Sequence, residues 1–423
     1  MELFDIFFCI TILGLTGYGF QLWAIRKTLQ AKSPGMGKKH SFAPDSLPPV
    51  SVLKPLKGLD DNLFDNLESI CLQNYPAYEI LFSLQDYNDP AYKVAKKIKD
   101  KHPGKDITIL VERCEDGLNP KVNNLIPAYR IAKHEHILIS DSNVMVDGHY
   151  LQSIIMHMAD PDVGLVSNMI TGVGGRSVGS ILENLHLNSF IMGSVCFLDR
   201  CLKMPCVVGK SMLMKKTDLN AIGGLKAFKD VLAEDYMIGK KMQSLTKKVV
   251  LSRYLIRNIN EYWGVRRFLN RHTRWGKLRW NIGGVSYVSE LIGNPVFMSC
   301  LPVLAGELSR VTVSFAMLVS SLKIFGDMYI GRVIAREDKA SSPGERELSH
   351  SPSLSMHPLW YFLSPVKDFL VGLIWFVPLF SNSVVWRGNR YIIGKDSVLS
   401  PCPETGLWSL RYRLADAIRT RFA

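Results

Sequence analysis

The stretch His136-Ile137-Leu138-Ile139-Ser140-Asp141-Ser142-Asn143 decides the fold class. Its apolar run is short and typical of a buried strand, and the polar residues that follow end that strand. In open sheets of parallel strands, ligands bind outside the carboxyl ends of the strands. The sequence therefore places Asp141 where a buried strand would present a functional group to a ligand.

The chain before this strand alternates between strand-like and helix-like patterns. The strand-like runs are short and apolar, and the helix-like runs repeat apolar residues at intervals of three or four. Such alternation predicts an α/β fold, with a mostly parallel sheet covered by helices. We expect strands over Val50–Leu53, Glu79–Leu84 and Ile107–Val111, and helices over Asp60–Cys71, Pro90–Lys101 and Val122–Ala132.

Apolar blocks near both ends of the chain have the composition of membrane segments. Leu3–Ile25 is close to the ~20 residues that cross a bilayer, and so are Tyr287–Gly306 and Val311–Ile330. Leu359–Phe380 is interrupted by prolines and charges, so it is either re-entrant or a full span. Basic residues follow the first block, and the positive-inside rule then places the N-terminus outside and the rest in the cytosol.

The region Tyr262–Ile282 places several arginines among tryptophans and other aromatic residues. A helix that is both basic and aromatic suits the headgroup layer of a membrane. We therefore divide the chain into an N-terminal transmembrane anchor (1–26), a linker (27–49), an α/β domain (50–260), a basic aromatic interfacial helix (261–282), two transmembrane helices (283–335), a polar loop (336–358), a re-entrant or transmembrane segment (359–382) and a basic cytosolic tail (383–423).

The composition narrows the class of partner. The net charge is +13, which attracts nucleic acid, anionic lipid or phosphorylated small molecules. A nucleic-acid-binding protein would not explain the apolar blocks, so we expect a membrane protein that binds no nucleic acid. The eight cysteines show no zinc-site spacing, which indicates reduced thiols facing the cytosol.

Three acidic residues are candidates for chemistry: Asp86 and Asp141, which follow predicted strands, and Asp235, which precedes a predicted helix. A carboxylate at a strand end can hold Mg²⁺ or Mn²⁺ together with a diphosphate. A second carboxylate can take the proton from an attacking hydroxyl. Taken singly, each of them is more often a helix cap or a turn residue.

The run Arg271-His272-Thr273-Arg274-Trp275 strengthens this interpretation. Two arginines three positions apart share a helix face that can hold a diphosphate, and the tryptophan can stack on a ring. The alternative is a membrane-surface helix without a catalytic role. Gly209-Lys210-Ser211 resembles the end of a phosphate-binding loop, but the glycine required five residues earlier is Met204, so we interpret it as structural.

Six motifs in order resemble the ceramide glucosyltransferase family from about residue 50 to 280, and more weakly near Trp386–Tyr391. They are Val50–Asp60 (VSVLKPLKGLD), Gln85–Ala91 (QDYNDPA), Asn119–Leu125 (NPKVNNL), Ser140–Ser142 (SDS), Ala233–Tyr236 (AEDY) and Arg271–Trp275 (RHTRW).

The resemblance implies a GT-A nucleotide-diphospho-sugar transferase domain at residues 50–260, UDP-glucose as donor, and inverting transfer of glucose to the primary hydroxyl of ceramide, a step of sphingolipid metabolism. It implies that Asp235 is the general base and that Asp141 holds the divalent cation, Mg²⁺ or Mn²⁺. Donor binding is assigned to Asp86, Lys54, Lys121, Arg271, Arg274 and Trp275.

Two departures from the family pattern leave alternatives open. Position 143 is Asn, so the metal motif is Asp-Ser-Asn, and the stretch Leu182–Phe190 lacks the His-Pro pair of the animal members. The alternative acceptors are a hopanoid, a diacylglycerol or a sterol, with N-acetylglucosamine or another hexose as the sugar. Processive polysaccharide synthesis would need more spans, and a degenerate, inactive domain would lack one of the acidic or Arg-x-x-Arg-Trp residues.

Overall fold

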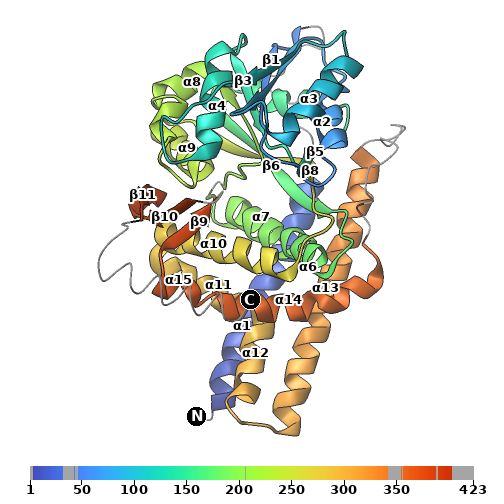
Figure 1. Ribbon diagram of the computed structural model, residues 1–423. Helices are drawn as coiled ribbons and strands as arrows, with labels where there is room; N and C mark the ends of the chain where they lie inside the picture. The colour runs from blue at the N-terminus through green and yellow to red at the C-terminus, as the bar shows by residue number, and fades with distance from the viewer. Residues whose placement is uncertain are drawn as a thin grey trace.

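The computed structural model describes residues 3–31, 42, 46–204, 206–341, 354, 356–386 and 389–402. An α/β domain stands above a group of membrane-length helices, and further helices lie between the two (Figure 1). The large sheet of the domain has the strand order β3-β2-β1-β4-β7-β6-β8-β5. Its strands are β1 (Val50–Pro55), β2 (Tyr78–Leu84), β3 (Ile107–Val111), β4 (His136–Ser140), β5 (Val144–Met145), β6 (Val163–Val173), β7 (Ser211–Lys215) and β8 (Lys248–Ile259).

The sheet confirms the predicted α/β class but is mixed. Strands β1 to β4 pair in parallel, whereas β7 runs antiparallel to both β4 and β6. Because β7 is antiparallel, its beginning lies beside the end of β4, and Ser211 pairs with Ser140. The residue before β7, Lys210, therefore reaches the same sheet edge as Asp141.

Helices cover both faces of this sheet, and each face has its own apolar core. Two of the helices start in the same way: Asp89 and Asn119 cap the first turn, and a proline follows each. The helices of the domain are α2 (Leu63–Cys71), α3 (Pro90–Lys101), α4 (Pro120–Ile131), α5 (Tyr150–Ile155), α6 (Val178–His186), α7 (Met192–Cys201), α8 (Lys216–Ala221) and α9 (Glu234–Ser244).

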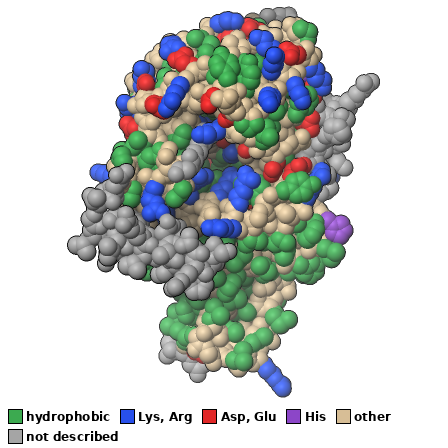
Figure 2. Space-filling model, in the orientation of Figure 1, with side chains coloured by type: hydrophobic (Ala, Val, Ile, Leu, Met, Phe, Trp, Pro, Cys, Tyr) green, Lys and Arg blue, Asp and Glu red, His purple; other side chains and the backbone are tan. Residues whose placement is uncertain are grey.

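Helices α1, α12 and α13 project from the domain as a stalk with an apolar surface (Figures 1 and 2). The 18-residue apolar window of Leu3–Leu29 is only 17% buried inside the protein, and that of Arg310–Asp338 only 22%. Val178–Cys201 also has the length and hydropathy of a span, but its window is 61% buried against the protein. The remaining helices are α1 (Leu3–Leu29), α10 (Val265–Gly283), α11 (Val288–Ile292), α12 (Pro295–Leu304), α13 (Arg310–Ser341), α14 (Ser364–Ile374) and α15 (Val377–Phe380).

One apolar block, Tyr287–Gly306, differs from the sequence expectation, and a second, Leu359–Phe380, was predicted as either re-entrant or a full span. Tyr287–Gly306 is no continuous helix: a break before Pro295 leaves the helices on either side bent by 69°. The proline ring cannot continue the preceding turn, which explains the break. In the block Leu359–Phe380, α14 and α15 run across the top of the stalk instead of along it (Figure 1).

The segment after these helices, where the sequence predicted only a basic tail, forms a three-stranded sheet. Its antiparallel strands are β9 (Ser383–Trp386), β10 (Asn389–Ile393) and β11 (Leu399–Pro401). It packs against the loop before α9: the amides of Leu232 and Ala233 donate to the carbonyl and hydroxyl of Ser397. The C-terminal sheet thus holds the segment that leads into Asp235. All eight cysteines are free.

A buried ionic cluster joins three helices where the stalk meets the domain. The Lys323 ammonium lies 2.6 Å from the Asp327 carboxylate, which also accepts a 2.7 Å hydrogen bond from Tyr18 of α1. On α14, Asp368 lies 3.4 Å from Lys323 and 2.7 Å from Lys367. Because the charges are paired across elements, the cluster specifies how α1, α13 and α14 pack.

We predict that Asp327→Ala destabilises the protein by about 3–5 kcal/mol, because it removes the main partner of a buried ammonium. Thermal unfolding in detergent would show a lower Tm. The double variant Lys323→Met/Asp327→Leu should recover most of the loss, because Lys367 still pairs with Asp368. Ser321→Ala, at an exposed position of α13, serves as control. A Tm for Asp327→Ala equal to that of the control would contradict a stabilising role for this cluster.

Candidate active site

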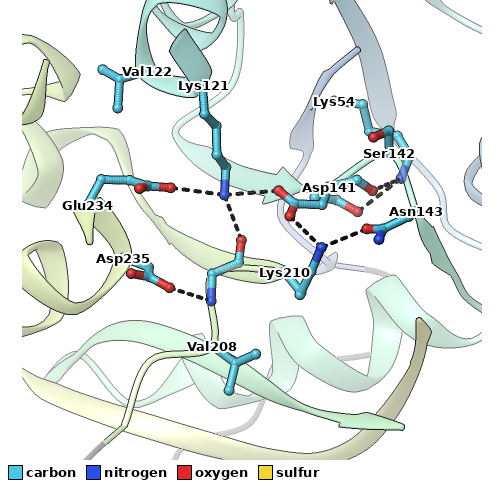
Figure 3. A network of polar contacts seen from close by, with 12 residues as sticks. Lys54, Lys121, Val122, Asp141, Ser142, Asn143, Val208, Lys210, Glu234 and Asp235 are labelled. Atoms are coloured by element: carbon cyan, nitrogen blue, oxygen red, sulfur yellow. Dashed lines mark hydrogen bonds and ion pairs between the residues drawn. The ribbon is translucent and has the colours of Figure 1, made fainter. Parts of the chain in front are cut away.

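Three lysines and one carboxylate meet at the carboxyl ends of β1 and β4 (Figure 3). Asp141 is held from both sides: Lys121 contacts its Oδ1 at 2.9 Å and Lys210 contacts its Oδ2 at 3.0 Å. Lys54, the penultimate residue of β1, donates to the Asp141 carbonyl at 2.8 Å and to the Ser140 hydroxyl at 3.2 Å. Three ammonium groups are thus concentrated at one sheet edge.

Lys121 connects this edge to α9. Besides Asp141, its ammonium contacts the Glu234 carboxylate at 3.0 Å and donates to the Gly209 carbonyl at 2.9 Å (Figure 3). The second carboxylate oxygen of Glu234 accepts from the Asn119 side chain at 3.2 Å. One cation therefore bridges the strand end and the segment that bears the candidate base.

Burial and charge act against each other in this cluster. Burial alone would lower the pKa of Lys121, but the carboxylates of Asp141, Glu234 and Asp235 outweigh it and raise that pKa. Burial alone would raise the pKa of Asp141, but Lys121 and Lys210 outweigh it and hold that pKa well below its usual range. Burial dominates at Lys54 and lowers its pKa to about 8.

Asp235 has the opposite electrostatic environment. Its carboxylate accepts hydrogen bonds from the amides of Gly209 and Tyr236 at 2.9 and 2.8 Å, and no lysine of the described residues forms an ion pair with it. Burial, and next the adjacent charge of Glu234, raise the pKa of Asp235 to about 6. A carboxylate with a pKa close to neutral is suited to accept a proton in a reaction.

The Arg-x-x-Arg-Trp run lies in α10. Arg271 lies 3.1 Å from the fully buried Glu183 carboxylate of α6, and its guanidinium carbon lies 4.4 Å from the Trp275 ring centroid. His272 contacts the same carboxylate at 2.7 Å. Arg274 is half-buried on this helix. The Glu183 carboxylate thus holds Arg271 by an ion pair and His272 by a hydrogen bond.

Asp86 lies apart from this cluster. It is exposed after β2, accepts from the Asn88 amide at 2.9 Å, and lines a small pocket with Leu56, Lys57 and Asp89. The structure therefore brings together Lys54, Lys121, Asp141 and Asp235 among the predicted site residues, and places Asp86 in a separate hollow of the same domain.

The donor set for a divalent cation is small. In the described part of the chain, no group of three or more His, Cys, Asp or Glu side chains is arranged to hold a metal. Asp141 offers hard carboxylate oxygens, which Lys121 and Lys210 contact at 2.9 and 3.0 Å. The side-chain oxygen of Asn143 accepts from Lys210 at 2.8 Å. A Mg²⁺ ion commonly uses one or two carboxylates plus substrate phosphates. The residues fit such a shared site, and they do not form a protein-only cage.

Sequence reasoning missed Lys210, Glu234 and Glu183. Lys210 was dismissed with its Gly-Lys-Ser run, and only the antiparallel direction of β7 shows that it reaches Asp141. Glu234 could have been noticed, because it stands directly before the candidate base. Glu183 becomes evident only when α6 and α10 are packed together.

Figure 2 shows lysine and arginine side chains around the hollow between the domain and the stalk.

The chain was compared with known proteins. Ceramide glucosyltransferase 1 of Caenorhabditis elegans is 29% identical over 360 residues, which cover 83% of this chain and 73% of that protein. Ceramide glucosyltransferase 3 of the same organism is 34% identical over 236 residues, covering 55% of this chain and 51% of that protein. These relatives confirm the resemblance that the six motifs indicated.

Solved structures give a more distant likeness. The mannosyltransferase PcManGT from Pyrobaculum calidifontis, in complex with GDP-Man and Mn²⁺, is 16% identical with a TM-score of 0.48, over 90% of this chain and 99% of that chain. A likeness of this size says nothing about the site. The model of glycosyl transferase family 21, in contrast, matches residues 6–399. The chain therefore belongs to glycosyl transferase family 21 and is a ceramide glucosyltransferase-like hexosyltransferase.

Proposed function

We propose that this protein transfers glucose from UDP-glucose to the primary hydroxyl of ceramide, with inversion at the anomeric carbon. The observation that carries the proposal is the Lys121 bridge, which joins a lysine-rich strand end to the segment bearing a carboxylate of raised pKa. The lysines at the strand end suit a diphosphate, and the carboxylate of Asp235 suits the proton of an attacking hydroxyl. The relatives named ceramide glucosyltransferases supply the choice of sugar and lipid.

In this proposal Asp235 acts as the general base. It takes the proton of the lipid hydroxyl while that oxygen forms a bond to the anomeric carbon. The bond from this carbon to the diphosphate oxygen breaks on the opposite face, and UDP leaves with the electron pair. One base and one stabilised leaving group are sufficient for an inverting displacement.

The donor side is assigned to the lysines and to α10. Lys54, Lys121 and Lys210 would contact the diphosphate and the charge that develops on it. Arg271, Arg274 and Trp275 would close over the donor, and the ion pair of Arg271 with Glu183 would hold that side chain in position. Asp86 would bind the uridine end from its separate pocket.

A divalent cation is part of the proposal, with Asp141 and the diphosphate oxygens as its ligands. The ammonium groups of Lys121 and Lys210 are already paired with the carboxylates of Asp141 and Glu234. These two ammonium groups therefore offer little net positive charge to offset a diphosphate. Mg²⁺ or Mn²⁺ would supply that charge.

The acceptor side faces the stalk. The stalk helices expose large apolar side chains, including Phe20, Trp23, Met317 and Phe325. We propose that α1 and α13 lie in a bilayer, with the α/β domain on the cytosolic side, as the basic residues after the first apolar block indicate. A lipid acceptor could then approach the site from the membrane without leaving the interface.

The test of function is transfer by purified protein in detergent. Labelled UDP-glucose and labelled UDP-N-acetylglucosamine would each be offered to ceramide, diacylglycerol, a sterol and a hopanoid polyol. Labelled glucosylceramide would support the proposal. A product on another lipid, or only with the second donor, would agree with the proposed mechanism but overturn the proposed substrate.

We predict that kcat/KM rises about tenfold per pH unit below pH 6 and levels off above it, because protonated Asp235 cannot act as a base. Asp235→Asn should lower kcat by about 10³-fold and leave UDP-glucose affinity nearly unchanged. Activity from pH 5 to 8 and isothermal titration would measure both. Asp162→Asn, at an exposed position, is the control. Near-normal turnover of Asp235→Asn would exclude it as the base.

We predict that removing divalent cations with EDTA lowers transfer by about 100-fold, because Lys121 and Lys210 are already paired with carboxylates. Adding excess Mg²⁺ or Mn²⁺ should restore the rate. UDP affinity, measured by titration calorimetry with and without Mg²⁺, should fall in parallel. Transfer and UDP binding that both resist EDTA would show that the lysines alone offset the diphosphate charge.

A further inference from the structure

The ammonium group of Lys210 lies between two side-chain oxygens that follow strand β4. It contacts Oδ2 of Asp141 at 3.0 Å and donates to Oδ1 of Asn143 at 2.8 Å (Figure 3). Carboxylate and amide oxygens are hard ligands of the kind that Mg²⁺ and Mn²⁺ prefer. A cation that belongs to the chain itself therefore lies where the Asp-Ser-Asn run offers two oxygens to a metal ion.

The other oxygen of Asp141 is held by Lys121, which is harder to displace. The Lys121 ammonium also contacts the buried Glu234 carboxylate at 3.0 Å and donates to the Gly209 carbonyl at 2.9 Å. Removing it would leave a buried carboxylate without its ion pair, which is costly. Lys210, in contrast, contacts one carboxylate and one neutral amide oxygen. Of these two ammonium groups, that of Lys210 is therefore the one that a divalent ion can replace.

The main chain of Lys210 is fixed, whereas its ammonium can change partner. The Asp141 amide donates to the Lys210 carbonyl at 3.1 Å, and the next residue, Ser211, accepts a 2.6 Å hydrogen bond from Asn168. The ammonium stands at the end of a flexible four-carbon stem. The side chains of Lys210 and Asp141 are 17% and 20% exposed, so small ions can reach this pair from solvent.

Exchanging the ammonium for a divalent ion changes the charge that a diphosphate would meet. As long as Lys210 pairs with Asp141, their charges cancel. A divalent ion at Asp141 would outweigh the carboxylate and release the ammonium, and these two positive charges would repel each other. A diphosphate between them would remove that repulsion. The ion and the diphosphate should therefore strengthen each other's binding.

We propose that Lys210 is a resident cation that keeps divalent ions from Asp141 and Asn143 until a diphosphate is present. When the donor and the ion bind together, Lys210 leaves Asp141 and pairs with the diphosphate. Lys210 is thus a positioning residue that couples binding of the ion to binding of the donor. This inference rests on the proposed function, because it takes the diphosphate of that donor as the second partner of Lys210.

The experiment measures Mn²⁺ binding by electron paramagnetic resonance, with the full chain in detergent and with or without UDP. Without UDP, Lys210→Met should lower the Mn²⁺ Kd by about tenfold, because no ammonium then competes for Asp141 and Asn143. UDP should tighten Mn²⁺ binding in the wild type. The factor by which it does so should be about tenfold smaller in the variant, which has no ammonium to release.

Three further variants control for charge and folding. Lys210→Arg keeps a cation, so its Mn²⁺ Kd without UDP should stay within about twofold of the wild type. Lys96→Met removes the same charge at an exposed position of α3 and should leave the Kd unchanged. Lys210→Gln keeps a donor for Asn143 and tests the proposal if Lys210→Met does not fold. It should also lower the Kd by about tenfold.

Wild-type Mn²⁺ affinity in the neutral variants at position 210 would overturn the proposal, and so would a wild type that binds no Mn²⁺ with UDP present. These measurements involve neither sugar nor lipid. If the wild type transfers glucose to no lipid, yet the neutral variants bind Mn²⁺ more tightly, the proposed function fails and the role of Lys210 stands. Formation of glucosylceramide with unchanged Mn²⁺ affinity in those variants would support the function and exclude that role.

Discussion

The site depends on one buried ammonium. Lys121 comes from the first turn of α4, Asp141 from the end of β4 and Glu234 from the start of α9, and the three meet only because a single cation satisfies both carboxylates. Without it, Glu234 would lose its ammonium partner and Asp141 would keep only Lys210, close to the carboxylate of Asp235. The same contact divides the cluster into two parts. Asp141 is kept ionised beside lysines, whereas Asp235 lies beyond their direct reach and has a raised pKa.

A second constraint is the boundary between water and the proposed membrane. A transferase that takes a water-soluble donor and a lipid acceptor must bring both to one place, and α10 lies between the α/β domain and the stalk (Figure 1). One side of this helix presents Arg271 and Trp275, and His272 and Arg279 line a narrow pocket above the stalk. Glu183 contacts both Arg271 and His272.

Much of the parallel half of the sheet could be predicted from sequence, because strand and helix repeats are local. The helix Pro90–Lys101 and the strand Ile107–Val111 have the predicted bounds. The features that the sequence analysis did not predict depend on long-range contacts. Strand β7 runs antiparallel to β4, and this direction brings Lys210 to Asp141. No local sequence pattern encodes the direction in which a strand joins a sheet. The break before Pro295 could have been predicted from the proline itself. The sheet β9–β11, in contrast, is stabilised by packing against a loop that its Ser397 contacts across 164 residues of sequence.

The C-terminal sheet also has a consequence for biosynthesis. Ser397 and Leu399 complete the hydrogen bonding of the segment 230–233, which leads into Asp235. These residues are synthesised after all of the helices α1 to α15 of the described chain. A nascent chain thus carries its lysines and carboxylates early, but it gains the support of the base only after those helices have been made. Such an order would keep incomplete chains from consuming donor sugar.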